Sequence, residues 1–274
     1  MAIHKILTLS LLIVLVVLIV ALKPLKAQGA KMWNHKKCAV CLTYDDALNV
    51  HLDKVLPVLD SLGLKGTFYV PVSFPGFKNR LADWKALAEK GNELGNHTIF
   101  HPCAGSLPGR DWVQPDYDLD KYTMKRFIDE VEMANVMLTE VDGKTRRTFA
   151  YTCGDKIVQD SSCVPYIKKM FVAARDVNAV MQPIDEIDLF NIGSYMINGD
   201  SGDKLIALVK QAYDKQALLV FLFHGVGGEH SINVSLRAHN ELLRYLKQNE
   251  NDIWVAPLVE IAEYIKEYQH VNNQ

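Results

Sequence analysis

The stretch CAVCLTYDD, residues 38–46, decides the fold class. It is largely apolar as far as Tyr44 and then ends in two adjacent acids, Asp45 and Asp46. A strand that is apolar throughout, rather than alternating, belongs in a parallel sheet that is covered on both faces. Charged side chains at the end of such a strand are typical of β/α proteins, whose functional groups gather at the carboxyl ends of the strands. We therefore expect an α/β fold with a site beside these two acids.

Beyond this stretch, apolar runs rich in β-branched and aromatic residues alternate with segments of helical period. The further strands that we expect are 66–70, 93–96, 148–151, 170–174, 189–192, 218–223 and 253–255. The expected helices are 48–62, 81–90, 119–140, 204–213, 236–248 and 258–268. Repeated β-α units form either an open doubly wound sheet or a closed barrel, and a count of about seven or eight strands favours the barrel.

The charge balance excludes two classes of partner. Lys and Arg number 30 against 32 Asp and Glu in 274 residues, so the chain has no strong field to hold nucleic acid or an anionic membrane. We expect a neutral ligand.

The N-terminus carries an apolar run, residues 6–22, which is interrupted by Thr8 and Ser10 and followed by Lys23. This pattern predicts an export signal that ends near Ala27. Its 17-residue length leaves an uncleaved membrane anchor as the alternative, and that anchor would be the only membrane contact. We expect residues 1–27 to be the signal peptide or anchor and 28–274 to be one catalytic domain. The protein would then be periplasmic or extracellular.

The chain has five cysteines, an odd number for an exported protein. Cys38 and Cys41 are three positions apart in a strand, so their side chains face opposite sides of the sheet. We predict that both are buried core residues that neither bind metal nor pair with each other. A pair at the rim of the barrel, such as Cys103 with Cys153, is one option for a disulfide.

The remaining polar residues of interest also follow strand ends, which share one face in a parallel β/α fold. They are Asp45, Asp46, His97, His101, Tyr151 to Asp155, Arg175 and His224. Taken singly, each has a plain structural explanation: the histidines could be loop or core residues, and Asp46 could cap the next helix. Their convergence on one rim favours a site.

The segment HTIFHP, residues 97–102, holds the two histidines best placed for metal binding. Pro102 disfavours the α conformation at His101, so we expect a turn that presents both rings rather than a helix. Two neutral imidazoles with one carboxylate are a common ligand set for catalytic zinc. Asp45 and Asp46 could then divide two roles, one binding the cation and the other accepting a proton.

These segments together resemble the polysaccharide deacetylases, the carbohydrate esterase family that includes chitin, peptidoglycan and acetylxylan deacetylases. The matching segments are Leu42 to Asp46, Gly95 to Pro102 and Leu222 to His224, with the strand Gly66 to Val70 between them. The resemblance implies a distorted (β/α) barrel of about seven strands, of the glycoside hydrolase/deacetylase type. It also implies a hydrolase that removes N- or O-linked acetyl groups from a polysaccharide or oligosaccharide.

The resemblance assigns roles to individual residues. Asp46, His97 and His101 would bind a divalent cation, usually zinc in this family. Asp45 would be the catalytic base and His224 the catalytic acid. Leu222 would line the pocket for the acetyl methyl group, and Tyr151 and Cys153 would border the substrate, with a backbone N–H near Cys153 for the oxyanion.

Two departures from the family pattern bear on these roles. Ala150 stands where the family usually carries an arginine that contacts the base, and Arg175 ends on the correct rim to take its place. The family's Asp-Trp motif is not evident near Asp188, so neither Asp185 nor Asp188 receives a role.

The main alternative is a sugar-binding relative that has lost turnover, which the missing arginine favours. A zinc peptidase is disfavoured because the sequence has no His-Glu-x-x-His segment. A non-enzymatic envelope protein would leave the polar rim unexplained.

Overall fold

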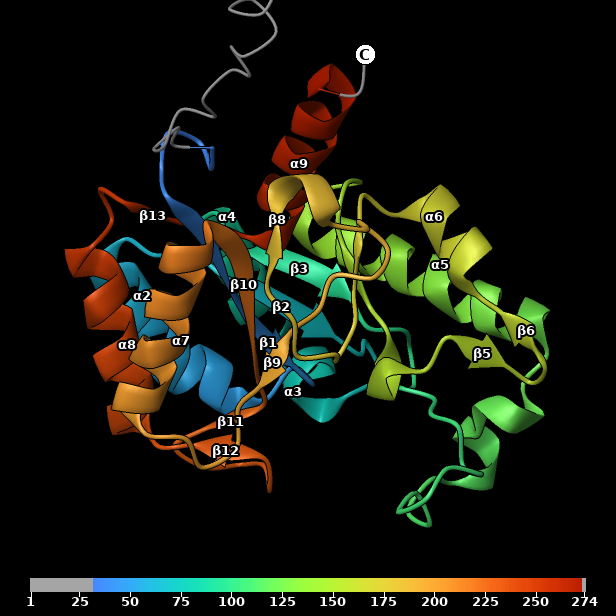
Figure 1. Ribbon diagram of the computed structural model, residues 1–274. Coiled ribbons are helices and arrows are strands. Elements are labelled where there is room, and N and C mark those ends of the chain that lie inside the picture. The colour runs from blue at the N-terminus through green and yellow to red at the C-terminus, as the bar shows by residue number, and fades with distance from the viewer. Residues whose placement is uncertain (1–31, 273–274) are drawn as a thin grey trace, which may run out of the picture. The chain divides into compact units, whose positions relative to one another are not determined.

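The 38–46 stretch forms the central strand β1 (Cys38–Asp45), in which every residue is buried. Figure 1 shows this strand in the computed structural model, which describes residues 32–272. Strand β1 pairs in parallel with β10 (Ala217–Phe223) along one side. On its other side it pairs with β13 (Ile253–Val255) near its start and with β2 (Thr67–Val70) near its end. The predicted segment 1–27 lies outside the described residues.

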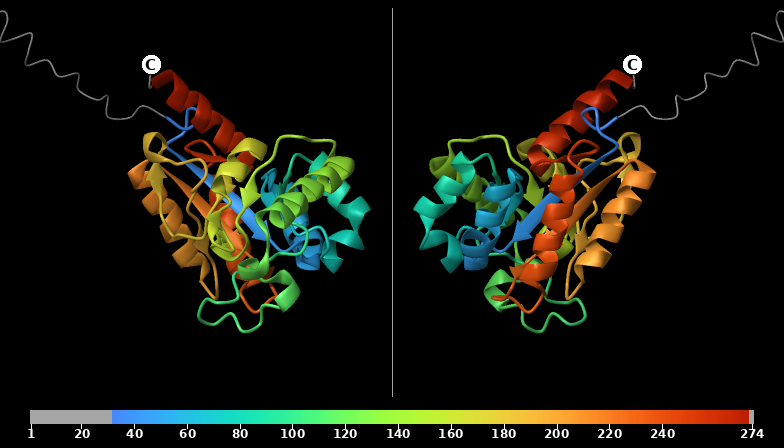
Figure 2. Two further views of the ribbon diagram at one scale, coloured as in Figure 1. Left: turned by 90° about the vertical axis from the view of Figure 1, so that its right-hand side faces the viewer. Right: turned by 90° about the vertical axis from the view of Figure 1, so that its left-hand side faces the viewer.

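The sheet continues on both sides of β1 in the order β7 (Ala174–Arg175), β4 (Phe149–Ala150), β3 (Glu93–Asn96), β2, β1, β10, β8 (Gln182–Pro183). All neighbours along this path are parallel except β8, which runs antiparallel to β10. Strand β9 (Tyr195–Met196) also pairs with β10. The path curls into the distorted (β/α) barrel of seven strands, which confirms the predicted fold class (Figure 2).

Helices cover the sheet, and three of them begin at a side-chain hydroxyl cap. The larger ones are α4 (Leu81–Glu89), α5 (Met124–Asp142), α7 (Gly202–Lys215), α8 (Leu236–Gln248) and α9 (Leu258–Asn272). The hydroxyls of Thr123, Ser201 and Ser235 accept backbone N–H groups at the starts of α5, α7 and α8, which satisfies donors that the helix itself cannot. None of the helices within residues 32–272 is both long enough and apolar enough to span a membrane.

Shorter elements complete the fold. They are the π-helix η1 (His51–Val55), α2 (Leu56–Leu62), α3 (Pro75–Lys78), α6 (Val164–Met170), and the 3-10 helices η2 (Pro115–Tyr117), η3 (Leu119–Lys121), η4 (Thr152–Gly154) and η5 (Ile184–Glu186). Two small ribbons join β5 (Ile157–Val158) to β6 (Ser161–Ser162) and β11 (Gly225–Val226) to β12 (Asn233–Val234).

The core lies on both faces of β1. Cys38, Val40 and Leu42 pack into a cluster with α2, α7 and α8, whereas Ala39 and Cys41 face a second cluster that contains the first half of α9. Cys38 and Cys41 are therefore buried on opposite sides of the sheet and unpaired, as predicted. Leu258, Ile261 and Ile265 of α9 fill this second cluster, while Asp45 closes β1 at its carboxyl end.

Three predicted elements differ from the structure. The predicted strand 170–174 was wrong in its first part because Met170 is the last residue of α6, and pairing starts only at Ala174. The predicted strand 189–192 is reduced to one bridge between Ile192 and Arg175, since a turn stabilised by Asp188 precedes it. The helix predicted at 119–140 starts only at Met124.

Candidate active site and metal centre

The backbone turns sharply where β1 ends. Asp46 and Ala47 both adopt left-handed backbone conformations, with φ of 76° and 49°. The next helical segment is not capped by Asp46. The carboxylate of Glu229 accepts the backbone N–H groups of Asn49 (3.0 Å) and Val50 (2.7 Å) instead. The capping explanation for Asp46 is therefore wrong, and its carboxylate faces the cavity.

His97 and His101 are presented by a turn after β3, as predicted, and not by a helix. The Asn96 side chain accepts the N–H of Thr98 (2.8 Å), and the Thr98 hydroxyl accepts the N–H of His101 (2.9 Å). Thr98 and His101 have φ of 66° and 56°. The two imidazole rings meet edge to face with centroids 4.7 Å apart, which directs both toward Asp46.

Asp46, His97 and His101 fit a cation. One ligand atom from each lies within 4.8 Å of the others. The Nδ1 of His97 donates to the carbonyl oxygen of Ala150 (2.9 Å), so its Nε2 carries a bare lone pair. Among the described residues, this Nε2 and the Oδ1 of Asp46 are buried without a hydrogen-bond partner, and they lie 4.0 Å apart. Burial also holds the pKa of His97 well below its ordinary value, which keeps the ring neutral.

Asp45 lies beside this group but is held by a different partner. The Nη2 of Arg175 donates to its Oδ2, and both side chains are buried. The Arg175 guanidinium also lies over the Tyr69 ring, 5.0 Å from the centroid. The Oδ1 of Asp45 is buried with no partner in the described part of the chain. Arg175 thus makes an ion pair with Asp45 that Ala150 cannot make.

His224 approaches Asp46 from the opposite side. Its Nε2 lies 3.8 Å from the Oδ2 of Asp46. Burial lowers its pKa, and the charges of Asp45 and Asp46 oppose that shift. The Nε2 of His51 donates to the backbone oxygen of His224 (2.8 Å), which fixes the chain at this point.

Sequence reasoning missed His230. Its Nε2 lies 4.0 Å from the Oδ2 of Asp46, and its ring stacks on that of His224 with centroids 4.8 Å apart and an interplanar angle of 16°. The signal was its place in the GVGGEH loop, residues 225–230, directly after the strand that delivers His224.

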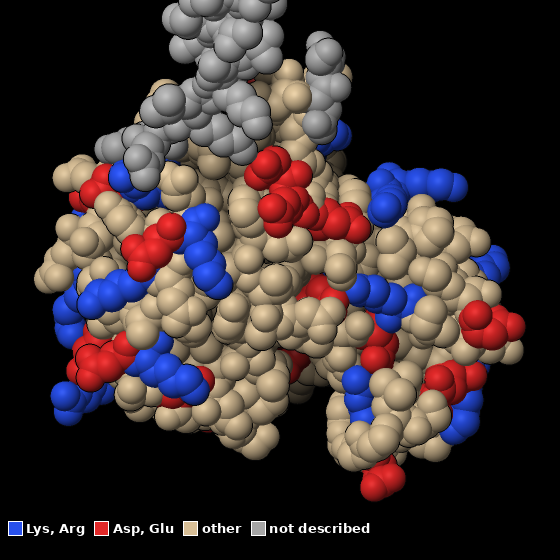
Figure 3. Space-filling model, in the orientation of Figure 1, with Lys and Arg blue, Asp and Glu red and all other residues tan. Residues whose placement is uncertain are grey.

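The candidate site opens into a cavity of about 480 Å³. Its walls are formed by Asp45, Asp46, Phe74, His97, His101, Trp112, Tyr151, Cys153, Val177, Met196, Leu222, His224, His230 and Ile232. All the predicted site residues are included except Arg175, which lies behind Asp45. Asp185 and Asp188 are exposed and do not line it. In Figure 3 the surface is hollowed between the region of β11 and β12 and the loop after His101.

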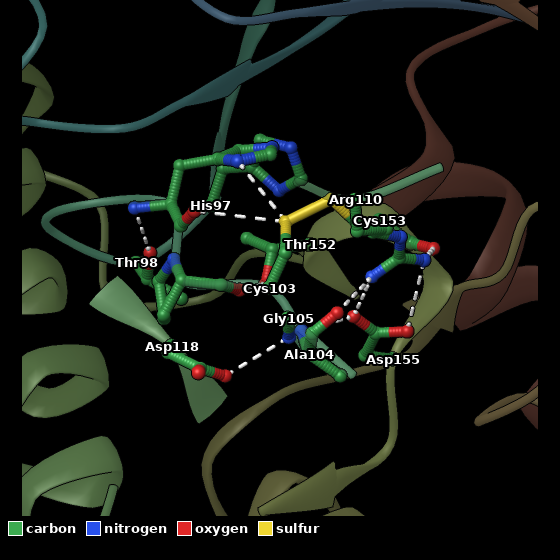
Figure 4. Close-up of a disulfide and its surroundings, with 12 residues drawn as sticks. His97, Thr98, Cys103, Ala104, Gly105, Arg110, Asp118, Thr152, Cys153 and Asp155 are labelled. Atoms are coloured by element: carbon green, nitrogen blue, oxygen red, sulfur yellow. Dashed lines mark hydrogen bonds and ion pairs between the residues drawn. A yellow bond between two sulfur atoms is a disulfide. The ribbon is translucent and has the colours of Figure 1, made fainter. Parts of the chain in front are cut away.

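A disulfide between Cys103 and Cys153 fixes one wall, which confirms the option considered from the sequence (Figure 4). Arg110 forms an ion pair with Asp155 beside it, and Asp155 accepts the N–H of Ala104 (2.8 Å). The sulfur of Cys103 lies 3.6 Å from the Nδ1 of His101. The cross-link therefore ties the loop after His101 to the segment after β4.

Left-handed backbone is concentrated around the site. The non-glycine residues with positive φ that border it are Asp46, Ala47, Thr98, His101, Cys153 and Glu229. Such residues cost of order 1–3 kcal/mol each and persist where the surrounding structure holds them, often at functional sites.

The chain is a curled β/α barrel. A His-His-Asp group and a second buried carboxylate lie at the carboxyl ends of its strands, an arrangement typical of a hydrolase site. The polysaccharide deacetylase profile matches residues 33–170. The chain therefore belongs to the polysaccharide deacetylase family.

Individual relatives are more distant. The peptidoglycan-N-acetylmuramic acid deacetylase PdaA of Bacillus subtilis is 29% identical over 112 residues, 40% of this chain and 36% of its own length. The chain spans between about a tenth and about a third of the length of the curated relatives that it matches.

Two solved structures share the fold. A protein of Mycobacterium smegmatis assigned to the polysaccharide deacetylases aligns over 90% of this chain and 94% of its own, with 15% identity and a TM-score of 0.62. A CE4 family pseudoenzyme from Bacillus anthracis aligns over 83% and 66%, with 18% identity and a TM-score of 0.50.

Proposed function

We propose that the chain is an exported, metal-dependent hydrolase that removes N- or O-linked acetyl groups from a carbohydrate. One observation carries the proposal: the grouped Asp46, His97 and His101 lie next to Asp45, a separate carboxylate whose Oδ1 has no hydrogen-bond partner among residues 32–272. A cation site and a proton acceptor are thereby adjacent but distinct.

Asp46, His97 and His101 would hold the cation, and zinc suits two neutral imidazoles with one carboxylate. When bound, the cation would polarise the acetyl carbonyl and make a water molecule more acidic.

The chain's own groups would carry the protons. Asp45 would accept the proton of the attacking water at Oδ1, while Arg175 holds its Oδ2. His224, across the cavity, would donate a proton to the departing amine or alcohol. Leu222 would contact the acetyl methyl group, and a backbone N–H near Cys153 would donate to the oxyanion.

The cavity wall supports a neutral, ring-shaped substrate. Trp112 is 57% exposed at the cavity and would stack on the apolar face of a sugar ring, with Tyr151 buried deeper in the same wall. The name of the relative PdaA describes a deacetylase of a peptidoglycan sugar, which agrees with an acetylated glycan as the partner. Nucleic acid remains a poor candidate because the net charge is only −2.

Export is part of the proposal. A disulfide between Cys103 and Cys153 suits an oxidising compartment, whether periplasmic or extracellular. Residues 1–27 would be a cleaved signal peptide or an anchor, and N-terminal sequencing of protein recovered from the producing cell would distinguish the two.

The alternative is a glycan-binding relative without turnover. It is considered because one of the similar structures is a CE4 family pseudoenzyme. The ion pair between Arg175 and Asp45 favours the enzyme, because it orients a base that would otherwise lack its arginine.

The test measures acetate release from a panel of N- and O-acetylated glycans together with bound zinc. We expect the parent protein to release acetate, and Asp45→Asn to reduce release by roughly 10²–10⁴-fold with zinc retained. Asp188→Asn, an exposed carboxylate outside the cavity, is the matched control and should change neither quantity. A zinc-loaded parent that binds these glycans but releases no acetate would establish the alternative.

A further inference from the structure

Within residues 32–272, no hydrogen bond to Nδ1 sets the orientation of the His224 ring. Its Nδ1 is buried without a partner in the described part of the chain. A histidine that transfers protons is usually oriented by a hydrogen bond to the nitrogen that does not face the substrate. His51 holds only the backbone of His224, so the imidazole needs another constraint.

The ring of His230 stacks on the ring of His224. The two rings lie nearly parallel, 16° apart in plane, with centroids 4.8 Å from each other. The backbone N–H of Ile232 donates to Nδ1 of His230 (3.0 Å), and the Ile232 oxygen lies 3.2 Å from the same atom. These two contacts with the Ile232 backbone hold the edge of the His230 ring in place.

The loop that carries His230 is anchored to the body of the protein. Glu229 has a φ of 70° and caps the segment after β1 through Asn49 and Val50. The Nζ of Lys54 donates to the oxygen of Gly227 (2.5 Å), and the N–H of Gly228 donates to the side chain of Asn233 (2.8 Å). These contacts fix the loop on which His230 stands.

We propose that His230 is a positioning residue for His224, holding the imidazole by ring stacking in the orientation from which it donates its proton. The inference rests on the proposed deacetylase function for its kinetic consequence, but not for its structural one. A stacked ring restricts rotation of its neighbour about the side-chain torsions, which a hydrogen bond to Nδ1 would otherwise do.

Two substitutions separate stacking from hydrogen bonding. His230→Phe keeps a flat ring and loses both nitrogens, whereas His230→Gln keeps a polar side chain and loses the ring. We expect His230→Gln and His230→Ala to lower kcat for unactivated amide substrates by about 10–100-fold, the usual effect of losing an orienting partner. Activated esters, whose leaving group needs no proton, should lose less than about threefold. His230→Phe should stay near the parent on both.

The matched control is Ser231→Ala, an exposed position in the same loop. It should leave both substrates and the zinc content unchanged. A loss in His230→Phe as large as in His230→Ala would overturn stacking as the cause. Equal losses on amides and esters would also overturn the inference, because a general loop defect would lower both.

An NMR measurement tests positioning without relying on activity. In the zinc-loaded protein with ¹⁵N-labelled histidine, the His224 ring signals should broaden or shift in His230→Ala and remain close to the parent in His230→Phe. Unchanged His224 signals in His230→Ala would refute the inference even in a fully active enzyme. A parent protein that releases no acetate would refute the proposed function while this measurement still decides the role of His230.

Discussion

Asp46 lies between two pairs of histidines whose rings pack in different ways. His97 and His101 face its Oδ1, and His224 and His230 face its Oδ2. In the first pair, the Nδ1 of His97 donates to a carbonyl oxygen, so Nε2 is a bare acceptor. In the second pair, the Nδ1 of His230 lies close to both the N–H and the carbonyl oxygen of Ile232. Backbone contacts at Nδ1 thus hold the rings of His97 and His230.

The packing of the two rings also differs between the two histidine pairs. The edge-to-face contact of His97 and His101 aims two nitrogens at one point, as a cation requires. The parallel contact of His224 and His230 keeps both rings side by side along the cavity wall. One carboxylate can therefore serve a metal centre on one side and a proton-transfer wall on the other.

The largest effect is expected on the metal side. His97→Ala or His101→Ala removes one of the three proposed ligands, so bound zinc should fall sharply and acetate release should fall roughly 10³-fold or more. Metal analysis after dialysis, with circular dichroism to verify folding, measures the loss. If both variants still bind stoichiometric zinc, His97 and His101 are not metal ligands.

The second-largest effect is expected for His224, in the other histidine pair. His224→Ala should retain zinc but lose about 10²–10⁴-fold of its turnover on amides and much less on activated esters. Comparing N-acetylated sugars with an aryl acetate measures the contrast. Loss of zinc from this variant would erase the distinction between the two histidine pairs.

A smaller effect is expected for Arg175, which forms an ion pair with Asp45. Arg175→Lys keeps a charge but not the forked guanidinium, so turnover should fall about 10–100-fold with zinc bound. Ser194→Ala, which removes a longer contact of 3.4 Å to Arg175, is the matched control and should stay close to the parent. An unchanged rate in Arg175→Lys would leave the orienting role without support.

A third set of histidines, His51 and His239, sharpens the comparison because both are buried and neither lines the candidate-site cavity. Burial lowers the pKa of His51 and His239 to about 4. Since unfolded histidine titrates near pH 6.5, the folded state binds fewer protons, and this stability is complete above pH 6.5 and lost as the pH falls toward 4.

Metal-free protein should therefore lose roughly 3 kcal/mol of unfolding free energy per buried ring at pH 4. Urea unfolding between pH 7.5 and 4.5 in the presence of chelator measures the slope. His239→Gln should flatten it, since Gln cannot titrate but can still accept from the hydroxyl of Tyr44, which bonds His239 at 2.9 Å. An equal slope in parent and variant would contradict the assigned cause.

The long apolar strands and the rim residues were predictable because each depends on local pattern. The run 38–46 is recognisable from its nearly continuous apolar residues, and the histidine turn 97–101 from the proline that follows it. Both therefore lie where expected. Arg175 could be placed at the correct rim because it directly follows an apolar segment.

Other features depend on partners far away in the chain. Glu229 replaces Asp46 as a helix cap from 180 residues away, and no local pattern reveals that substitution. Strands as short as Ala174–Arg175 have no periodicity to detect, so tertiary pairing alone defines them. His230 was overlooked because its role requires the loop geometry that brings its ring onto His224.

The left-handed residues around the site limit which amino acids evolution can place there. Asp46 and His101 must satisfy two demands at once, a particular side chain and a backbone conformation that favours glycine or asparagine. Few amino acids combine the two, whereas Ala47 faces only the backbone demand and can accept glycine. In a library of all single substitutions, we therefore expect fewer tolerated amino acids at Asp46 and His101 than at Ala47.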